Sequence, residues 1–402
     1  MVLSLFTLIF PINDSLTKKV EAIIKTFPAG TQYGIMVFDP QLNDTLVAIN
    51  IDKTLIPASN TKLFSSSAAL FIAGADFELS NTFVTDDLNI DDSVINGNLF
   101  IVGKCNPLFD SEDLTEMINE LMNLNIKRIT GNVLGDDSFF DKDYYRHNWI
   151  EGETAYITVS PVSALILNDN YVTTKVGRRE QTILMKSPPI EISKIILDSL
   201  IARGIKVDGS YGEGVAPAKV KTLATSQIRL TDLLKPVNKS SDNFYAECVF
   251  RLLGAVAFGS QGTALKSYQA LYTYLRDIQL NREGLEIVDG SGISRSNRTS
   301  AANITHLLEK MYNDYYYYND FYSSLAIGGV DGTLRKRMKG GAAEGNFRGK
   351  TGTLNGVSTL SGYLKTKKGN DLVVTILINY TRGYHDFYRE KQDRIVEIFT
   401  GY

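Results

Sequence analysis

Apolar residues recur with helical or strand spacing at both ends of the chain. Helical spacing covers 15–27 and 386–399, and alternating apolar positions predict strand pairs within 33–51 and 359–380. Antiparallel strands with one buried face commonly assemble from hairpins of this kind. We therefore expect the N-terminal and C-terminal segments to share one antiparallel sheet.

The pattern changes in the middle of the chain. From 76 to 222, short strands are separated by turns rich in Gly, Asn and Asp, with two amphipathic helices near 111–123 and 191–202. We expect 76–222 to be an inserted domain of short strands and two helices. The outer domain is then discontinuous and consists of 12–75 and 223–402.

Composition and charge argue against several functions. The 402 residues are 44% hydrophobic and 22% charged, as in a folded globular protein, and their number predicts more than one compact unit. A net charge of −3 without a basic patch argues against nucleic acid as a partner. The three histidines lack the spacing of a zinc site or a Ser-His-Asp triad. A nucleophile in this chain therefore needs a base other than histidine.

Two features stay open at the level of sequence. Cys105 and Cys248 are expected to be separate, buried thiols, although the sequence does not decide whether they pair. The apolar run Val2–Phe10 is too short to span a bilayer and lacks the basic residues that open a secretory signal. It is either the tail of a signal peptide whose start is missing or a segment that packs on the domain. Membrane association is expected to be peripheral at most.

The first candidate for chemistry is the Ser-Asn-Thr-Lys segment at 59–62, at the predicted start of a helix that ends at Gly74. Residues three apart on a helix share a face, so the Lys62 amine can reach the Ser59 hydroxyl. A serine hydroxyl needs a base to become a nucleophile, and a desolvated lysine can serve. Ser-x-x-Lys occurs again at 15–18, where we expect a solvated helix start, so this motif alone is weak.

The second candidate is Ser241-Asp242-Asn243, which lies between two predicted helices. Ser241 could relay a proton toward a leaving amine, and Asn243 could hold a substrate amide or Lys62. Capping of the second helix by Ser241 or Asp242 is the alternative, and on local grounds the more common one.

The third candidate is Lys350-Thr351-Gly352-Thr353, at the start of a predicted strand. Lys350 would offer a cation to a carboxylate, Thr351 a hydroxyl, and Gly352 space for a substrate backbone. The backbone N–H of Thr353 would form an oxyanion hole with that of Ser59. A simple turn is the alternative.

Together the three motifs are specific, because this ordered set is expected by chance at around the per cent level. The set resembles that of penicillin-binding proteins and class A β-lactamases. The separation of Ser59 and Ser241, 241 − 59 = 182 residues, leaves room for the insertion. With the segments 289–295 and 329–334, the chain resembles the D-alanyl-D-alanine carboxypeptidase/endopeptidase family of the penicillin-binding protein 4 type, peptidase family S13.

The resemblance implies an α/β (α+β) penicillin-binding/β-lactamase-like transpeptidase fold, in which helices flank a five-stranded antiparallel sheet and a β-rich domain is inserted. It implies a serine D-Ala-D-Ala carboxypeptidase or endopeptidase that acts on peptidoglycan peptides and is covalently inhibited by β-lactams. The expected location is the cell envelope, periplasmic or otherwise extracytoplasmic. No metal or organic cofactor is implied, and the oligomeric state is left open.

The resemblance also implies roles for the motif residues. Ser59 would be acylated by the penultimate D-Ala, with Lys62 as general base. Ser241 would pass the proton to the departing amine, and Lys350 with Thr351 would bind the terminal carboxylate.

Further substrate contacts are expected at Arg295, within the matching segment 289–295, and at Trp149, Glu153 and Tyr156 in the insertion. The chain departs from the family pattern at Asn106, where relatives often have an aspartate.

Two rival functions remain. A β-lactamase of the same superfamily would need a Glu-x-x-Leu-Asn segment to activate the deacylating water, and none lies between Asn243 and Lys350. A non-catalytic peptidoglycan-binding module would keep the fold without turnover, but the intact motif residues argue against it.

Overall fold

The computed structural model describes residues 14–146, 159–176 and 179–402, and the chain divides into two compact units. The first unit comprises Met1–Ser67, Lys235–Ser241 and Leu275–Tyr402, and the second comprises Ala68–Leu234 and Asp242–Tyr274. The boundaries expected for the inserted domain, 76 and 222, stay a prediction. Within the described residues, no helix combines the length and apolar character needed to cross a membrane.

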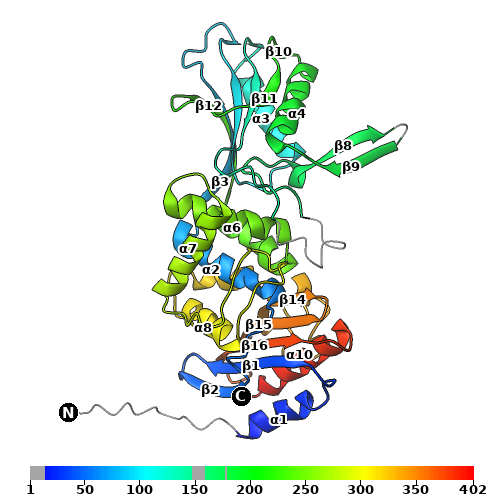
Figure 1. Cartoon of the computed structure of the whole chain (residues 1–402). Coiled ribbons are helices and arrows are strands. Elements are labelled where there is room, and N and C mark those ends of the chain that lie inside the picture. The colour runs from blue at the N-terminus through cyan, green and yellow to red at the C-terminus, as the bar shows by residue number, and fades with distance from the viewer. Residues whose placement is uncertain (1–13, 147–158, 177–178) are drawn as a thin grey trace, which may run out of the picture. The chain divides into compact units, whose positions relative to one another are not determined.

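One antiparallel sheet organises the first unit, with the strand order β13-β14-β15-β16-β1-β2 (Figure 1). Strand β1 near the N-terminus pairs with β16 near the C-terminus, which confirms that the two ends share a sheet. Five strands match the expected sheet, and the two-residue β13 adds a sixth at one edge. The strands are β1 (Gln32–Asp39), β2 (Asp44–Ile49), β13 (Ala326–Ile327), β14 (Phe347–Leu354), β15 (Val357–Lys365) and β16 (Asp371–Asn379).

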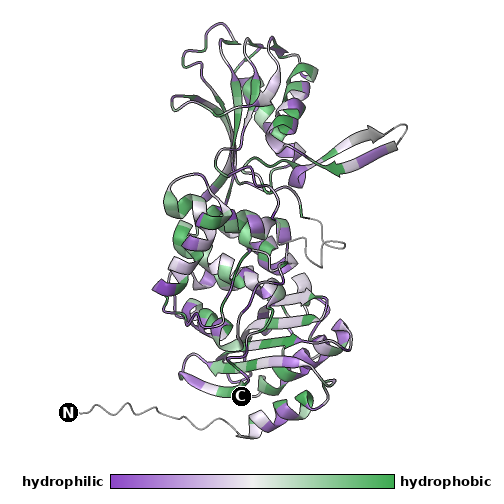
Figure 2. Ribbon diagram, viewed as in Figure 1, coloured by the Kyte–Doolittle hydropathy of each residue, from purple (hydrophilic) through white to green (hydrophobic). Residues whose placement is uncertain are grey.

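Helices cover both faces of this sheet. Side chains of α1 and α10 join strand residues in one apolar core, and both helices carry polar and apolar positions (Figure 2). This division is typical of amphipathic helices that pack on a sheet. The helices and short helical turns of the first unit are α1 (Asp14–Ile24), α8 (Ala301–Tyr312), α9 (Tyr318–Ser324), α10 (His385–Phe399), two 3₁₀ turns (Ala58–Asn60 and Gly332–Leu334) and a π-helical turn (Pro236–Ser240).

Strand alternation gives the sheet one apolar face and one that is partly polar. Leu360 and Ile376 are paired across β15 and β16 and lie in the core with α1 and α10. The neighbouring positions Thr359 and Thr375 are on the opposite face, where Thr305 of α8 donates to the Thr375 hydroxyl at 2.9 Å. Buried hydroxyl groups are therefore available on the second face.

The second unit contains a five-stranded sheet in the order β11-β7-β5-β3-β12, a three-stranded sheet β10-β6-β4 and the hairpin β8-β9. Side chains of α3 and α4 pack with β3, β5 and β7 in its core. Its strands are β3 (Glu78–Thr85), β4 (Val94–Ile95), β5 (Leu99–Lys104), β6 (Arg128–Ile129), β7 (Val133–Asp136), β8 (Tyr171–Val176), β9 (Arg179–Leu184), β10 (Lys206–Val207), β11 (Tyr211–Glu213) and β12 (Lys221–Arg229).

Both helices expected in the insertion are present, as α3 and α4. A capping box between Asp110 and Asp113 starts α3. Helix α4 begins earlier than expected because prolines fit the first turn of a helix, where their missing N–H is not needed. Helix α2 (Thr61–Ala73) begins in the first unit, which includes its residues up to Ser67, and ends in the second. The other helices of this part of the chain are α3 (Ser111–Asn123), α4 (Pro188–Ala202), α5 (Leu230–Lys235), α6 (Asn243–Phe258) and α7 (Ala264–Asp277), with a 3₁₀ turn at Asn168–Asn170.

Cys105 and Cys248 lie in the second unit as buried, free thiols. Burial, together with a hydrogen bond to the Cys105 side chain, raises the pKa of the Cys248 thiol. The two residues are thus unpaired, as expected, although their thiol groups are neighbours.

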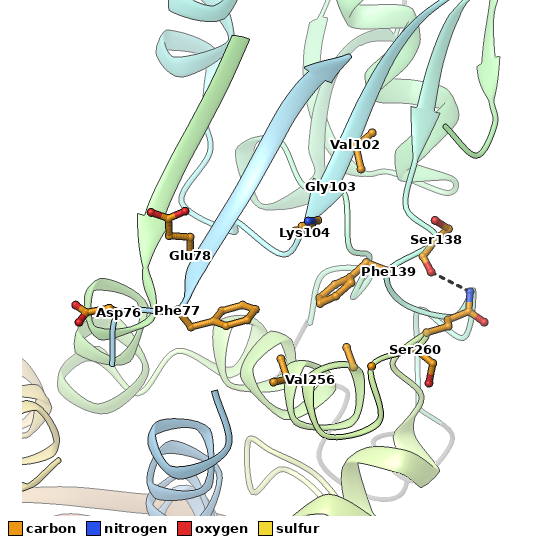
Figure 3. A pocket seen from close by; sticks show the side chains of 13 residues that line it. Asp76, Phe77, Glu78, Val102, Gly103, Lys104, Ser138, Phe139, Val256 and Ser260 are labelled. Atoms are coloured by element: carbon orange, nitrogen blue, oxygen red, sulfur yellow. Dashed lines mark hydrogen bonds between the residues drawn. The ribbon is translucent and has the colours of Figure 1, made fainter. Parts of the chain in front are cut away.

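A cavity of about 770 Å³ lies within the second unit (Figure 3). The rings of Phe77 and Phe139 line it, together with the charged side chains of Glu78 and Lys104. None of its lining residues belongs to the three sequence motifs. The candidate chemistry is therefore not in this cavity.

The apolar face of the first sheet should dominate the stability of that unit. Ile376 is fully buried, so Ile376→Ala is expected to lower the free energy of unfolding by about 2–5 kcal/mol, through lost burial and the cavity left behind. Leu42→Ala is the control. Leu42 is 66% exposed, so its substitution should lower the free energy of unfolding by about 0.5 kcal/mol or less. Chemical denaturation of both variants tests this, and equal losses would contradict the assigned core.

Candidate active site

Ser59 lies in the 3₁₀ turn that leads directly into α2. The Lys62 Nζ donates a hydrogen bond to Ser59 Oγ at 3.1 Å and another to the carbonyl oxygen of Ser291 at 2.7 Å. Lys62 is fully buried, whereas Ser59 is half-buried. The two residues of the first motif are therefore in contact, with a desolvated amine on a partly accessible hydroxyl.

Ser241 follows the π-helical turn and has a left-handed backbone, with φ 62° and ψ 36°. Its hydroxyl accepts a hydrogen bond from Lys350 Nζ at 2.7 Å. Asp242 caps α6 by accepting from the Tyr245 N–H at 2.9 Å. The capping alternative thus applies to Asp242, while the Ser241 hydroxyl faces the third motif. Asn243 begins α6 and belongs to the second unit.

Lys350 is fully buried on β14, and its amine also donates to the Thr351 carbonyl oxygen at 2.8 Å. Burial, and then the positive charge of Lys62, hold the pKa of Lys350 well below its ordinary value. Charge repulsion in a buried site disfavours a second ammonium group beside the first. The site is therefore suited to a lysine amine that exchanges its proton.

Gly352 allows β14 to approach the turn that carries Ser59. A Cβ atom at Gly352 would lie 3.0 Å from Ser59 N, 2.8 Å from the Pro57 carbonyl oxygen and 2.2 Å from Thr359 Oγ1. Contacts of this length leave no room for a side chain. The expected oxyanion groups, the backbone N–H of Ser59 and that of the residue after Gly352, hence belong to segments in direct contact.

The two threonines of the third motif are bound by neighbouring side chains. Thr353 Oγ1 accepts from Arg389 of α10 at 3.2 Å, which leaves its backbone as its main contribution to the site. Thr351 Oγ1 donates a hydrogen bond to Thr333 Oγ1 at 2.8 Å. Thr333 is a candidate site residue that the motifs do not identify. The only sequence signal for it is its place in the segment 329–334.

An ion pair fixes the segment that carries Thr333. Lys239, in the turn before Ser241, pairs with Asp331. Asp331 also accepts from the Ile327 N–H at 2.7 Å. The hydroxyls of Ser241 and Thr333 are therefore carried by two segments that one ion pair joins.

The backbone before the nucleophile is strained. Ala58 is buried with a φ of 48°, a conformation that costs about 1–3 kcal/mol in a residue other than glycine. Polar side chains hold the surrounding chain, of which Thr359 and Asn60 are buried and Asn379 is half-buried. The contacts are Thr359 Oγ1 to the Pro57 carbonyl (2.9 Å), Asn60 Nδ2 to the Lys350 carbonyl (3.0 Å), and Asn379 to both the N–H and the carbonyl of Ile56 (2.9 and 3.1 Å).

Four further residues are expected to contact the substrate. Arg295 donates to the Asn355 carbonyl in the first unit. Trp149, Glu153 and Tyr156 lie outside the described residues. In the part of the chain that the structure describes, no group of three or more His, Cys, Asp or Glu side chains is arranged to hold a metal ion.

Fold and site together place the chain in the class of serine acyl-transfer enzymes with the penicillin-binding fold. A model described as "D-Ala-D-Ala carboxypeptidase 3 (S13) family" matches residues 16–184 and 177–401, and the chain belongs to this family. The expected family and enzyme class, a serine-type D-Ala-D-Ala carboxypeptidase, are thereby confirmed.

Individual relatives agree with this assignment. A D-alanyl-D-alanine carboxypeptidase of Actinomadura sp. (strain R39) is 26% identical over 90% of this chain and 81% of its own length. The crystal structure of penicillin-binding protein 4 (dacB) from Haemophilus influenzae superposes with a TM-score of 0.81 at 20% identity, covering 95% of this chain and 99% of its own. A peptidoglycan endopeptidase of Bdellovibrio bacteriovorus gives 0.54 at 18% identity, covering 86% and 85%. The expected fold is confirmed.

The contact at Gly352 predicts a large effect of one methyl group. Gly352→Ala should displace β14 from Ser59 N and slow acylation by a fluorescent penicillin about 100-fold, since displacements of about 1 Å can cost that much. Gly212→Ala on β11 is the control, because its Cβ would find only an ordinary 3.6 Å contact. Acylation at the wild-type rate in Gly352→Ala would show that the close approach is not required.

Proposed function

We propose that the enzyme cleaves D-alanyl bonds in peptidoglycan stem peptides through an acyl-enzyme on Ser59. The observation that supports this most directly is the contact of Lys62 with Ser59, beside the contact of Lys350 with Ser241, within one compact unit. Both contacts join an amine to a hydroxyl, so one can serve acylation and the other the leaving group.

In acylation, the Lys62 amine takes the proton from Ser59 Oγ as this oxygen attacks the carbonyl carbon of the penultimate D-Ala. The carbonyl oxygen becomes an oxyanion, which the backbone N–H groups of Ser59 and Thr353 stabilise. The N-terminal end of α2 adds a favourable field for negative charge at this point.

When the tetrahedral intermediate collapses, the C–N bond breaks and the departing amine needs a proton. Ser241 passes to this amine the proton that Lys62 took from Ser59, while the hydrogen bond from the Lys350 amine holds the Ser241 hydroxyl in place. Lys350 and Thr351 bind the terminal carboxylate, and Asn243 holds the substrate amide. Arg295, Trp149, Glu153 and Tyr156 are proposed as further substrate contacts.

Water then hydrolyses the ester on Ser59 and restores the enzyme. A β-lactam enters the same sequence, but its leaving group stays tethered, so the acyl-enzyme should persist. Peptidoglycan is extracytoplasmic, which agrees with a periplasmic or other extracytoplasmic location.

Substitution of Ser59 tests the nucleophile. The wild-type protein should form a long-lived adduct with a fluorescent penicillin and release D-Ala from a D-Ala-D-Ala peptide, whereas Ser59→Ala should do neither. Ser15→Ala, in the second Ser-x-x-Lys segment, is the control and should behave as wild type. Equal labelling of Ser59→Ala would rule out the acyl-enzyme, and rapid penicillin turnover by the wild type would favour a β-lactamase.

Removal of the lysine tests the base. Lys62→Ala should lower the acylation rate about 10²–10⁴-fold, the range that general-base catalysis supplies. Acylation at a rate close to wild type would exclude Lys62 as the base.

The bond that is cleaved can be identified on the natural polymer. Digestion of purified peptidoglycan, followed by mass spectrometry, should show loss of terminal D-Ala and cleavage of D-alanyl cross-links, because both present a D-Ala carbonyl to Ser59. Intact peptides alongside a penicillin adduct would leave the protein as a β-lactam-reactive enzyme with another substrate.

A further inference from the structure

A loop over 287–297, outside the three motifs, is anchored beside the nucleophile. Its two ends are joined by backbone hydrogen bonds between Glu286 and Arg298, at 2.8 and 2.7 Å. Directly after this base, Thr299 and Leu55 exchange two more backbone bonds, at 3.0 and 2.8 Å. The base of the loop is therefore tied to the chain segment that leads into Ser59.

The Asp289 carboxylate organises the interior of this loop. Asp289 is fully buried, and it accepts hydrogen bonds from Gly292 N, Ser294 N and Asn297 Nδ2, each at 2.8 Å. A carboxylate can accept all three, because it has only acceptor sites. An amide in its place would offer one acceptor oxygen and an NH₂ group that faces other donors. The shape of the loop hence depends on this acid.

The loop contacts two side chains of the helix that carries Lys62. The Ser291 carbonyl oxygen accepts from Lys62 Nζ at 2.7 Å, and the Gly290 carbonyl oxygen accepts from Ser65 Oγ at 2.9 Å. Lys62 and Ser65 are three residues apart, on one face of α2. Two successive carbonyl groups of the loop are therefore bound by the helix that carries the proposed base.

The other side of the loop contacts the strained turn at Ala58. Gly292 has a φ of 84°, and a Cβ there would lie 2.0 Å from the Ala58 carbonyl oxygen. Only a glycine fits both the conformation and the space. A change in loop shape would hence move the nucleophile turn as well as the acceptor of the Lys62 amine.

We propose that Asp289 is a positioning residue, which holds the Lys62 amine on Ser59 by fixing the carbonyl group of Ser291. The inference rests on the proposed roles of Ser59 and Lys62. Lysine has a flexible four-carbon stem, so its amine needs a fixed acceptor to stay in place. Asp289 itself need not touch the substrate.

Asp289→Asn tests the inference against a matched control. Asp39 is also buried in the first unit and accepts backbone N–H groups, from Gln41 at 2.9 Å and Leu42 at 3.0 Å. In Asp289→Asn, the acylation rate constant for a fluorescent penicillin should fall about 10–100-fold, while the constant for non-covalent binding stays at its wild-type value. Asp39→Asn should change neither constant.

A second pair of variants covers the case in which Asp289→Asn does not fold. Ser65→Ala removes the bond to the Gly290 carbonyl and should slow acylation about fivefold, the effect of one lost hydrogen bond. Ser67→Ala is its control, since Ser67 is equally buried on α2 but donates to Phe64 within the helix, at 3.1 Å. Wild-type acylation in Ser65→Ala would then overturn the inference.

The double variant Asp289→Asn/Lys62→Ala separates positioning from general stability. If Asp289 acts through Lys62, its substitution should have no further effect on the slow acylation of Lys62→Ala. An additive loss, or equal losses in Asp289→Asn and Asp39→Asn, would overturn the inference. A wild-type protein that penicillin does not label at Ser59 would instead refute the proposed function.

Discussion

Strand β14 reaches the turn that carries Ser59 only because Gly352 has no side chain. The contacts that join the strand to this turn depend on that approach. The Asn60 side chain can bond the Lys350 carbonyl, and the Thr359 hydroxyl can bond the Pro57 carbonyl, only when strand and turn are in contact. The same proximity lets the charge of Lys62 lower the pKa of Lys350. A single close backbone contact therefore sets both the geometry and the electrostatics of the two lysines.

Strain and polarity in this region have a common explanation. The conformation of Ala58 is unfavourable, so the surrounding structure must hold it. The sheet does so with two polar side chains, the buried Thr359 and the half-buried Asn379, while its other face forms an apolar core. Burial of hydroxyl and amide groups costs free energy unless they are hydrogen-bonded. Here each bond holds a backbone group of the turn before Ser59, and so the polar face serves the site.

Local patterns predicted the parts of this molecule that local physics determines. Ser59 and Lys62 are three residues apart at the start of a helix, so their spacing alone predicted the contact. Strand periodicity predicted β1, β2, β15 and β16, whereas the five-stranded sheet was implied by the family resemblance. The two-residue β13 is too short to show periodicity. Whether Ser241 or Asp242 caps α6 could not be decided locally, because the answer depends on Lys350, 109 residues away. Thr359 and Thr333 contribute single hydroxyls from segments distant in sequence, and no spacing rule could identify them.

The hydrogen-bond acceptors of the two buried lysines that are described above are neutral groups. A carboxylate partner would favour the ammonium form and raise the pKa of a lysine. Lys350 instead donates to a hydroxyl and a carbonyl oxygen, both neutral, so its hydrogen bonds are satisfied without that stabilisation of charge. The Ser291 carbonyl offers Lys62 an acceptor of the same kind. Neutral acceptors orient an amine yet leave its proton available, which is the combination that acyl transfer without histidine requires.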